Sequence, residues 1–541
     1  PDSTAGHGHH TASAMLAEEA FAAAADPKRF ADQLDATRPW QTKRLLWNVF
    51  SFGVTKVDSS WLTVDVGAYD PLLGRSMSEL AGLSRSNHKS QGFGAVERRG
   101  SLPQYLSLRA GAAAKRDPFD GVDLTWKRFP GGDAVGALLA QAERQFDARH
   151  PEALLPVLAK AHAALGKLPE NGLIARRRYE LEQVMASCAG LWLEAVSARP
   201  SATPGEGVSV ATSVLVRTPA QVTLESVSVD ETEHAMSRSL APNVAAADTL
   251  RFTLRDDIAV TQPYWLRLPV SQGLFRVADR ADLGEPENRP ALTATFRLKM
   301  SGEPVTFGLP VAYRWTDPVQ GERWRAFEVS PPATLAFEQP FQLFADGTPR
   351  MLRVTVHAQK NKLAGTLRLE LPSGWSVKPA STPVAIERES AEQNVVFTLV
   401  PGRDGGTARA VLDVGGHAWS QGVQRIDYAH LPVQTLFPPA EVKVVRADVT
   451  LTTSRVGYLA GSGDQIAEAL RQLGATVTPL SDDDVASGDL GRFETIVTGV
   501  RAYNTRPRLR ALLARLLDWA AKGGTLMVQY VTTSDGPVDY L

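Results

Sequence analysis

The chain has 541 residues and a formal net charge of −1, with 58 Lys and Arg against 59 Asp and Glu. This balance excludes a protein that recruits nucleic acid or anionic membranes through a global positive field. Hydrophobic residues make up 43% of the chain, and no apolar run approaches the ~18 residues of a membrane span. We therefore expect a core-forming protein of three or four domains, and the single Cys188 excludes an internal disulfide framework and favours a buried thiol.

Histidine is concentrated at the start of the chain. His7, His9 and His10 lie in a Gly-rich loop that leads into an apolar helix predicted from Thr11 to about Ala25. A neutral imidazole is a good zinc ligand, and a second imidazole nearby can hold or donate a proton beside the metal. The alternatives are a purification-tag remnant or a solvated loop, because the spacing alone is not specific.

Two longer stretches resemble a known family. Residues 6–21, GHGHHTASAMLAEEAF, resemble the second histidine motif of the PIG-L/LmbE-like zinc-dependent N-deacetylases. Residues 64–94 resemble the late part of the catalytic domain in large multidomain bacterial members, and the likeness continues to RAYNTR at 501–506. By this resemblance His10 is the last zinc ligand, and His7 stabilises the oxyanion and protonates the leaving amine.

The same resemblance assigns the neighbours of these two residues. His9 takes the place of the Asp that usually precedes the ligand, and His88 and Gln91 match a His-x-Ser-Gln element near the active site. A C-terminal His favoured by the helix dipole is the alternative for His88. The family's first motif, His-Pro-Asp-Asp, does not occur in this sequence. We therefore expect a fragment whose remaining zinc ligands lie on a missing N-terminal segment.

The pattern of residues 1–115 is that of part of an α/β domain. Runs 44–53 and 61–69 are strand-like, and 76–89 is a predicted helix with Met77, Leu80 and Leu83 on one apolar face. With the resemblance, this segment is predicted to be the C-terminal part of a Rossmann-like deacetylase domain.

Residues 116–199 are predicted to be helical. Apolar residues recur at three- and four-residue spacing in 135–146, 152–165 and 175–197, with turns at Pro151 and 169–172 between them. The run Arg176 to Arg178 is expected on a solvated face.

Residues 200–440 switch to short alternating runs separated by turns rich in Pro, Gly and Asp. This period of two predicts two immunoglobulin-like β-sandwiches, at 200–330 and 331–440, with the boundary at Pro331 and Pro332. Tryptophan side chains in them could form a carbohydrate platform, but core or interface packing is the favoured interpretation. The residues concerned are Trp265, Trp315 and Trp375.

Residues 441–541 alternate strands with helices, which predicts a parallel sheet of flavodoxin or glutamine-amidotransferase type, incomplete at its C-terminus. The segment contains no Cys, so glutaminase chemistry is excluded. The GSGD turn at 461–464 could receive an anion. Arg501, Tyr503 and Asn504 follow the strand at 494–500 and form a candidate small-ligand or interdomain site, with loop anchoring as the alternative. The predicted strands are 444–460, 475–480, 494–500 and 523–531, and the helices 465–474 and 508–524.

The expected fold class is thus multidomain α/β plus all-β. The parent protein is expected to be a zinc-dependent enzyme that hydrolyses the acetamide of an N-acetylated amino sugar or related glycoconjugate, with this fragment alone inactive. The alternative is a non-catalytic scaffold that binds glycans or proteins, because roughly three quarters of the chain lies outside the deacetylase segment. No nucleic acid or membrane span is expected, and stacked sandwiches favour an extracytoplasmic location by association only.

Overall fold

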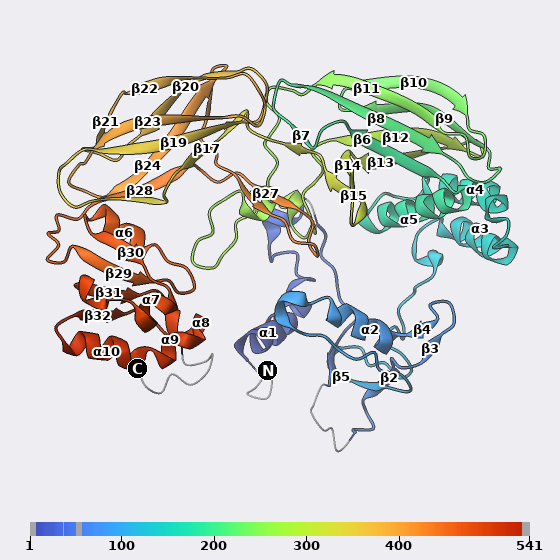
Figure 1. The fold of residues 1–541 in the computed structure, drawn as a ribbon. Helices are drawn as coiled ribbons and strands as arrows, with labels where there is room; N and C mark the ends of the chain where they lie inside the picture. Colours follow the sequence, from blue (N-terminus) through green and yellow to red (C-terminus); the bar gives the residue numbers. More distant parts are fainter. Residues whose placement is uncertain (1–6, 36, 50–56, 533–541) are drawn as a thin grey trace. The chain divides into compact units, whose positions relative to one another are not determined.

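The computed structural model describes residues 7–35, 37–49 and 57–532, which Figure 1 shows as a ribbon. The chain divides into two compact units, one of Pro1–Ala140 with Ala164–Ile174 and one of Gln141–Ala163 with Ala175–Leu541. The fold is mixed α/β with several sandwich-like sheets, which confirms the predicted class at this level. Within the described ranges, no helix is both long enough and apolar enough to cross a membrane.

The segment before residue 116 forms helices and short strands. The N-terminal helix begins at Gly8, three residues earlier than predicted, so that His10 lies in its first turn. The elements are α1 (Gly8–Ala23), β1 (Arg44–Asn48), β2 (Leu62–Asp65), β3 (Tyr69–Asp70), β4 (Arg75–Ser76), α2 (Met77–Ser86) and β5 (Pro103–Gly111).

The sheet of this segment has the order β1-β5-β2, and β5 runs antiparallel to both neighbours. A Rossmann-like sheet would be parallel, so this part of the prediction is wrong for the strands described before residue 116. The Asp65 carboxylate shows why β5 runs back along β2. It accepts hydrogen bonds from the N–H groups of Gly67, at 2.9 Å, and Leu102, at 2.7 Å, and so fixes the start of β5 beside the end of β2.

Helix α2 packs through small residues rather than through the predicted apolar face. Met77 and Leu83 are 49% and 38% exposed, whereas Ser78 and Gly82 are buried. A Cβ on Gly82 would lie 2.9 Å from Cα of Glu97, so the chain passes too close for a larger residue. This close approach, which hydrophobic spacing does not report, decides which face is buried.

The helical segment ends earlier than predicted. Gly190 follows the third helix with φ of +57°, a left-handed conformation that terminates a helix. Residues 192–197, predicted as the last turns of that helix, form a strand instead. Cys188 is buried, as expected. The helices are α3 (Gly132–Gln145), α4 (Leu155–Leu165) and α5 (Gly172–Ala189), with the 3-10 turn η5 (Pro151–Leu154) before α4.

The first sandwich-like region therefore starts at Trp192 rather than at 200. Its buried side chains alternate along the strands, as the period of two predicts. Its strands are β6 (Trp192–Ser197), β7 (Ser201–Ala202), β8 (Gly207–Leu215), β9 (Val222–Val229), β10 (Thr232–Ser239), β11 (Ala246–Thr253), β12 (Thr293–Met300), β13 (Glu303–Pro310), β14 (Ala312–Asp317), β15 (Gly321–Ala326) and β16 (Glu328–Val329).

These strands form two main sheets, with the orders β10-β9-β12-β13 and β11-β8-β6-β14-β15. All pairs in them are antiparallel except β6 with β14. Fully buried side chains such as Val210, Leu224 and Phe296 line the space between the sheets. Side chains on the opposite face of the five-stranded sheet point away from this core.

The second sandwich-like region has one continuous apolar core that draws residues from both of its sheets. Trp375 belongs to this core, donates from Nε1 to the carbonyl of Asp404 at 2.7 Å and is 7% exposed. Core packing, the favoured interpretation for this tryptophan, is confirmed. The strands are β17 (Ala333–Phe337), β18 (Phe341–Phe344), β19 (Arg350–Ala358), β20 (Leu363–Glu370), β21 (Ser376–Lys378), β22 (Ser381–Ile386), β23 (Glu392–Val400), β24 (Gly406–Val414), β25 (His417–Trp419) and β28 (Glu441–Arg446), with the hairpin β26 (Gln424–Ile426) and β27 (Gln434–Leu436).

The C-terminal region contains the predicted parallel sheet, in the order β30-β29-β31-β32. The predicted strand at 444–460 is divided, because 441–446 pairs with β18 and β24 of the preceding sandwich. The elements are β29 (Arg455–Leu459), α6 (Ile466–Gln472), β30 (Thr476–Pro479), α7 (Asp482–Ser487), β31 (Thr495–Thr498), α8 (Ala502–Thr505), α9 (Pro507–Ala511), α10 (Leu513–Ala521) and β32 (Thr525–Val528).

Candidate functional site

The three N-terminal histidines gather at the start of α1. His7 is the N-cap residue, and its carbonyl accepts hydrogen bonds from the N–H groups of His10, at 3.0 Å, and Thr11, at 3.3 Å. The ring centroids of His7 and His10 are 4.2 Å apart with an interplanar angle of 30°. The ring of His9 meets that of His7 edge-on at 5.5 Å, and all three residues are exposed. The first turn of the helix thus places two imidazoles side by side at the surface.

The pair can be compared with the ligand set of a zinc site. A catalytic zinc site uses three protein ligands and keeps one position open for water or substrate. Within residues 7–35, 37–49 and 57–532, no group of three or more His, Cys, Asp or Glu side chains is arranged to hold a metal ion. The imidazole donors fit zinc chemically, and a complete site needs further ligands beside them.

His88 and Gln91 lie on a different element, the turn that follows α2. The Nδ1 of His88 is 3.2 Å from the carbonyl oxygen of Arg85, to which it donates in the matching tautomer. Gln91 ends the 3-10 turn η3 (Lys89–Gln91), and its N–H donates to the carbonyl of His88 at 3.2 Å. The contacts of these two exposed residues stay within their own turn, so their place near an active site stays a prediction.

A hollow of about 440 Å³ lies beside the C-terminal half of α1. Its apolar wall includes Leu16, Phe30 and Trp40, which are 63%, 56% and 66% exposed. Glu19 and Arg29 form an ion pair of 3.0 Å at its edge. The lining begins six residues after His10, so the histidines and the hollow share one helix but occupy different parts of it.

The candidate residues of the C-terminal region hold a loop in place. Tyr503 is fully buried in an apolar core, and this burial raises the pKa of its hydroxyl. The side chain of Asn504 pairs with the backbone of Thr532, donating from Nδ2 at 2.8 Å and accepting at Oδ1 at 3.1 Å. The N–H of Arg501 donates to the carbonyl of Tyr530 at 2.7 Å. These contacts support loop anchoring, and a ligand role for the three residues stays a prediction.

The carboxyl ends of β29 and β31 meet where open α/β sheets commonly bind ligands. Here the Asp464 carboxylate accepts hydrogen bonds from the N–H groups of Ile466, at 3.0 Å, and Val500, at 2.9 Å, and from the Tyr458 hydroxyl. Burial acts against ionisation, yet these hydrogen bonds lower the pKa of Asp464. The protein's own carboxylate thus uses the N–H of Ile466, at the start of the helix after the GSGD turn, which an anion there could otherwise accept.

Tyr458 was not among the predicted site residues, and Asp464 was named only as part of the GSGD turn. The signal in the sequence was the pair of glycines near them. A Cβ on Gly461 would lie 2.0 Å from the carbonyl oxygen of Val500, and a Cβ on Gly499 would lie 2.6 Å from the Tyr458 hydroxyl. Both glycines therefore serve the close packing of two loops.

Comparison with known proteins does not identify a family. No family model and no curated protein sequence matches the chain. Among solved structures, red sea bream transglutaminase is similar over 52% of this chain and 34% of its own, with 12% identity and a TM-score of 0.22. The alpha-2-macroglobulin of Salmonella has a TM-score of 0.17 and 12% identity, over 47% of this chain and 16% of its own. The alpha-2-macroglobulin of E. coli has a TM-score of 0.17 and 10% identity, over 48% of this chain and 17% of its own. The chain therefore spans about a third or less of the length of these structures.

Proposed function

We propose that the chain is part of a zinc-dependent N-deacetylase that hydrolyses the acetamide of an N-acetylated amino sugar or related glycoconjugate. The observation that carries this proposal is the juxtaposition of His7 and His10, whose ring centroids are 4.2 Å apart on an exposed first helical turn. The resemblance of residues 6–21 to the second histidine motif of the PIG-L/LmbE-like family gives the two imidazoles separate roles.

The chemistry follows from the two imidazoles. His10 would hold the zinc, and the other ligands would come from a His-Pro-Asp-Asp motif, which does not occur in this sequence. When bound, zinc supplies Lewis-acid polarisation of the amide carbonyl and activation of water. Water adds to the carbonyl carbon and would give its proton to an Asp of that motif, while the protonated ring of His7 would donate a hydrogen bond to the developing oxyanion. The C–N bond then breaks, and the His7 proton goes to the leaving amine nitrogen.

Apolar surface in the same segment gives independent support. Among the described residues between 7 and 115, Leu62 is the only apolar side chain in the buried class. Met15 and Leu16 of α1 are 58% and 63% exposed, and Trp47 of β1 is 49% exposed. A folded domain of this size buries about two thirds of its chain surface. We infer that a further polypeptide segment covers this surface, as the proposed catalytic domain requires.

The roles of the two histidines are separable in the full-length protein that includes the His-Pro-Asp-Asp segment. His10→Ala should lose zinc, measured by mass spectrometry of the bound metal, and turnover with it. His7→Ala should keep zinc but lose about 10²–10⁴-fold in turnover of an N-acetylglucosamine conjugate, because a positioned general acid contributes about that factor.

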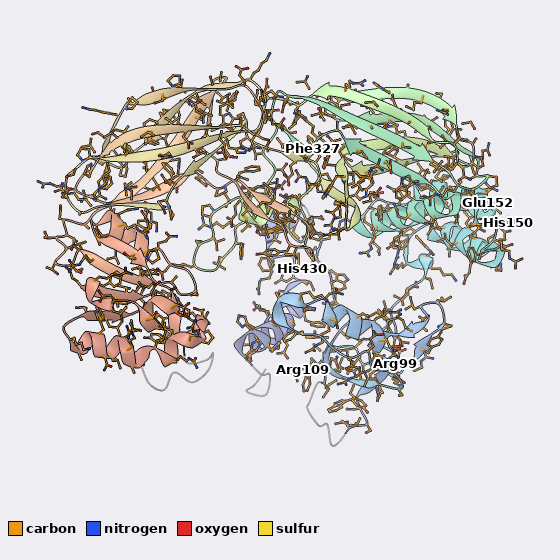
Figure 2. The ribbon with its side chains drawn as sticks, in the orientation of Figure 1. Arg99, Arg109, His150, Glu152, Phe327 and His430 are labelled. Atoms are coloured by element: carbon orange, nitrogen blue, oxygen red, sulfur yellow. The ribbon has the colours of Figure 1, made fainter. Side chains whose placement is uncertain are left out.

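His430→Ala is the matched control, since His430 is an exposed histidine of another part of the chain, labelled in Figure 2. It should retain both zinc and turnover. Retention of zinc by His10→Ala, or full turnover by His7→Ala, would contradict the assigned roles.

A further inference from the structure

The five-stranded sheet of the first sandwich-like region has an outer face that differs from its buried one. Successive side chains of a strand point to opposite faces. Ala195 and Val210 are buried at 2% and 0% exposure, whereas their strand neighbours Glu194 and Ala211 belong to the other face, and Ala211 is exposed. The outer face therefore includes the side chains of β6 and β8 that alternate with the core residues.

This outer face is hollowed. A depression of about 520 Å³ extends over β11, β8, β6 and β14. Charged side chains line this depression, and among them Arg314 Nη1 lies 3.0 Å from Glu194 Oε1. Small or short side chains form its floor, so ligand atoms can approach the sheet closely. These floor residues are Val196, Ala211, Ser213, Ala247 and Thr249.

Two partly exposed tryptophans share this face. Trp324 of β15 lies directly opposite Arg314 of β14, so both project to the same side, and it is 39% exposed. Trp192 is 44% exposed and precedes Glu194 by two residues on β6, which places it on the same side. An arginine guanidinium lies over each ring, at 5.1 Å for Trp324 and 5.4 Å for Trp192.

We propose that this outer face binds an extended carbohydrate chain. A pyranose ring presents an apolar face of C–H groups that stacks on an aromatic ring, and hydroxyl groups at its edge that both donate and accept hydrogen bonds. Trp192 and Trp324 stack on this apolar face through the ring faces opposite the guanidinium groups of Arg217 and Arg314. Glu194 accepts hydrogen bonds, and Arg251 and Arg314 donate them, in the hollow between the strands.

The charges on this face favour a neutral polymer over an anionic one. Four charged side chains line the hollow, and two of them, Glu194 and Arg314, pair with each other. The other two are Arg251 and Asp248. Asp248 is bound to His234, at 2.6 Å between Oδ2 and Nδ1. Such a mixed charge gives little attraction for a polyphosphate backbone. The floor also lacks the large apolar pockets in which protein partners anchor aromatic side chains.

Isothermal titration of the full chain with hexamers of N-acetylglucosamine and of glucose tests the proposal. At least one hexamer should bind the wild-type protein, and Trp192→Ala and Trp324→Ala should each weaken that binding about tenfold. Trp47→Ala is the control, because Trp47 is 49% exposed but lies on β1 of the other compact unit. It should bind like wild type.

A second variant separates a lost contact from a lost fold. Ala211→Gln keeps both tryptophans and fills the floor of the hollow, so it should also weaken binding while the circular dichroism spectrum stays that of wild type. The proposal is overturned if the wild-type protein binds neither hexamer, or if the folded tryptophan variants bind as tightly as wild type. Binding is measured without turnover, so this result is independent of the deacetylase proposal.

Discussion

His162 of α4 is held between two carboxylates. Its Nε2 lies 3.1 Å from Oε1 of Glu182 on α5, and its Nδ1 lies 3.0 Å from Oε1 of Glu303 on β13. Ionised carboxylates only accept hydrogen bonds, so both ring nitrogens must carry a proton for both bonds to form. The residue is 9% exposed, and in its imidazolium form it ties two helices to a sheet of the first sandwich-like region.

This geometry predicts a pH-dependent local stability. The hydrogen bond to Glu182 outweighs burial and, together with the bond to Glu303, raises the pKa of His162. Because the folded-state pKa is raised, the stabilisation is fully present below about pH 6.5, the unfolded value, and is lost as the pH rises through the folded-state pKa. Hydrogen exchange of the α4 amides should show a local opening free energy that falls as the pH rises above about 6.5.

His162→Gln should lower that opening free energy by about 2 kcal/mol at pH 6, since hydrogen bonds to charged groups contribute about 1.5–3 kcal/mol. It should also remove the pH dependence. The control is His150→Gln, because the His150 side chain is 70% exposed and lies 3.5 Å from Glu152, a pair labelled in Figure 2. An unchanged pH dependence in His162→Gln would show that another group is responsible.

At this scale the sequence indicated residue types better than their contacts. The clustering of His7 and His10 was visible, because they lie within four positions of the sequence, but the ring separation needed the structure. The outward faces of Trp192 and Trp324 were missed. Trp192 was assigned to a helix, and the side on which Trp324 projects depends on how β14 and β15 pair.

Helix α10 buries one face in the core of the C-terminal region and exposes the other. Leu516 is fully buried in the core of the C-terminal region, whereas its neighbour Leu517 is 52% exposed. Leu516→Ala should destabilise this region by about 2–5 kcal/mol, through lost burial and the cavity left behind. Pulse proteolysis across a urea series, with peptides from residues 455–532 identified by mass spectrometry, measures the effect.

Leu517→Ala makes the same chemical change one residue further along the helix. Its effect should stay within about 0.5 kcal/mol, as for most exposed positions. Equal destabilisation by the two variants would contradict the burial of this helix face.

The elements of the C-terminal region were predictable because local pattern and tertiary environment agree there. Strand β31 is buried along its whole length and reads as a short apolar run, as strands of covered parallel sheets do. Prediction failed where one close contact decided the packing. The close approach at Gly82 determined which face of α2 is buried. Gly190 ended α5, and the residues after it formed a strand that pairs with β8.

At the scale of the whole molecule, the two compact units differ in how they bury apolar residues. The second sandwich-like region has a continuous core from both of its sheets, and the C-terminal region has its own core. The described part of residues 7–115 instead leaves Trp40, Trp47 and Leu108 66%, 49% and 42% exposed. Composition averages over the whole chain and hides this contrast, so the sequence could not indicate which segment leaves its apolar side chains uncovered.

The central claim is that the imidazole pair at the start of α1 belongs to a zinc centre. An anomalous difference map at the zinc edge tests this directly, from crystals of the full-length protein grown with zinc. We expect a peak at about 2.0–2.1 Å from a ring nitrogen of His10, with the ring of His7 beside it but outside the coordination shell. A fully loaded zinc site that does not include His10, or crystals grown with zinc that show no peak there, would contradict it.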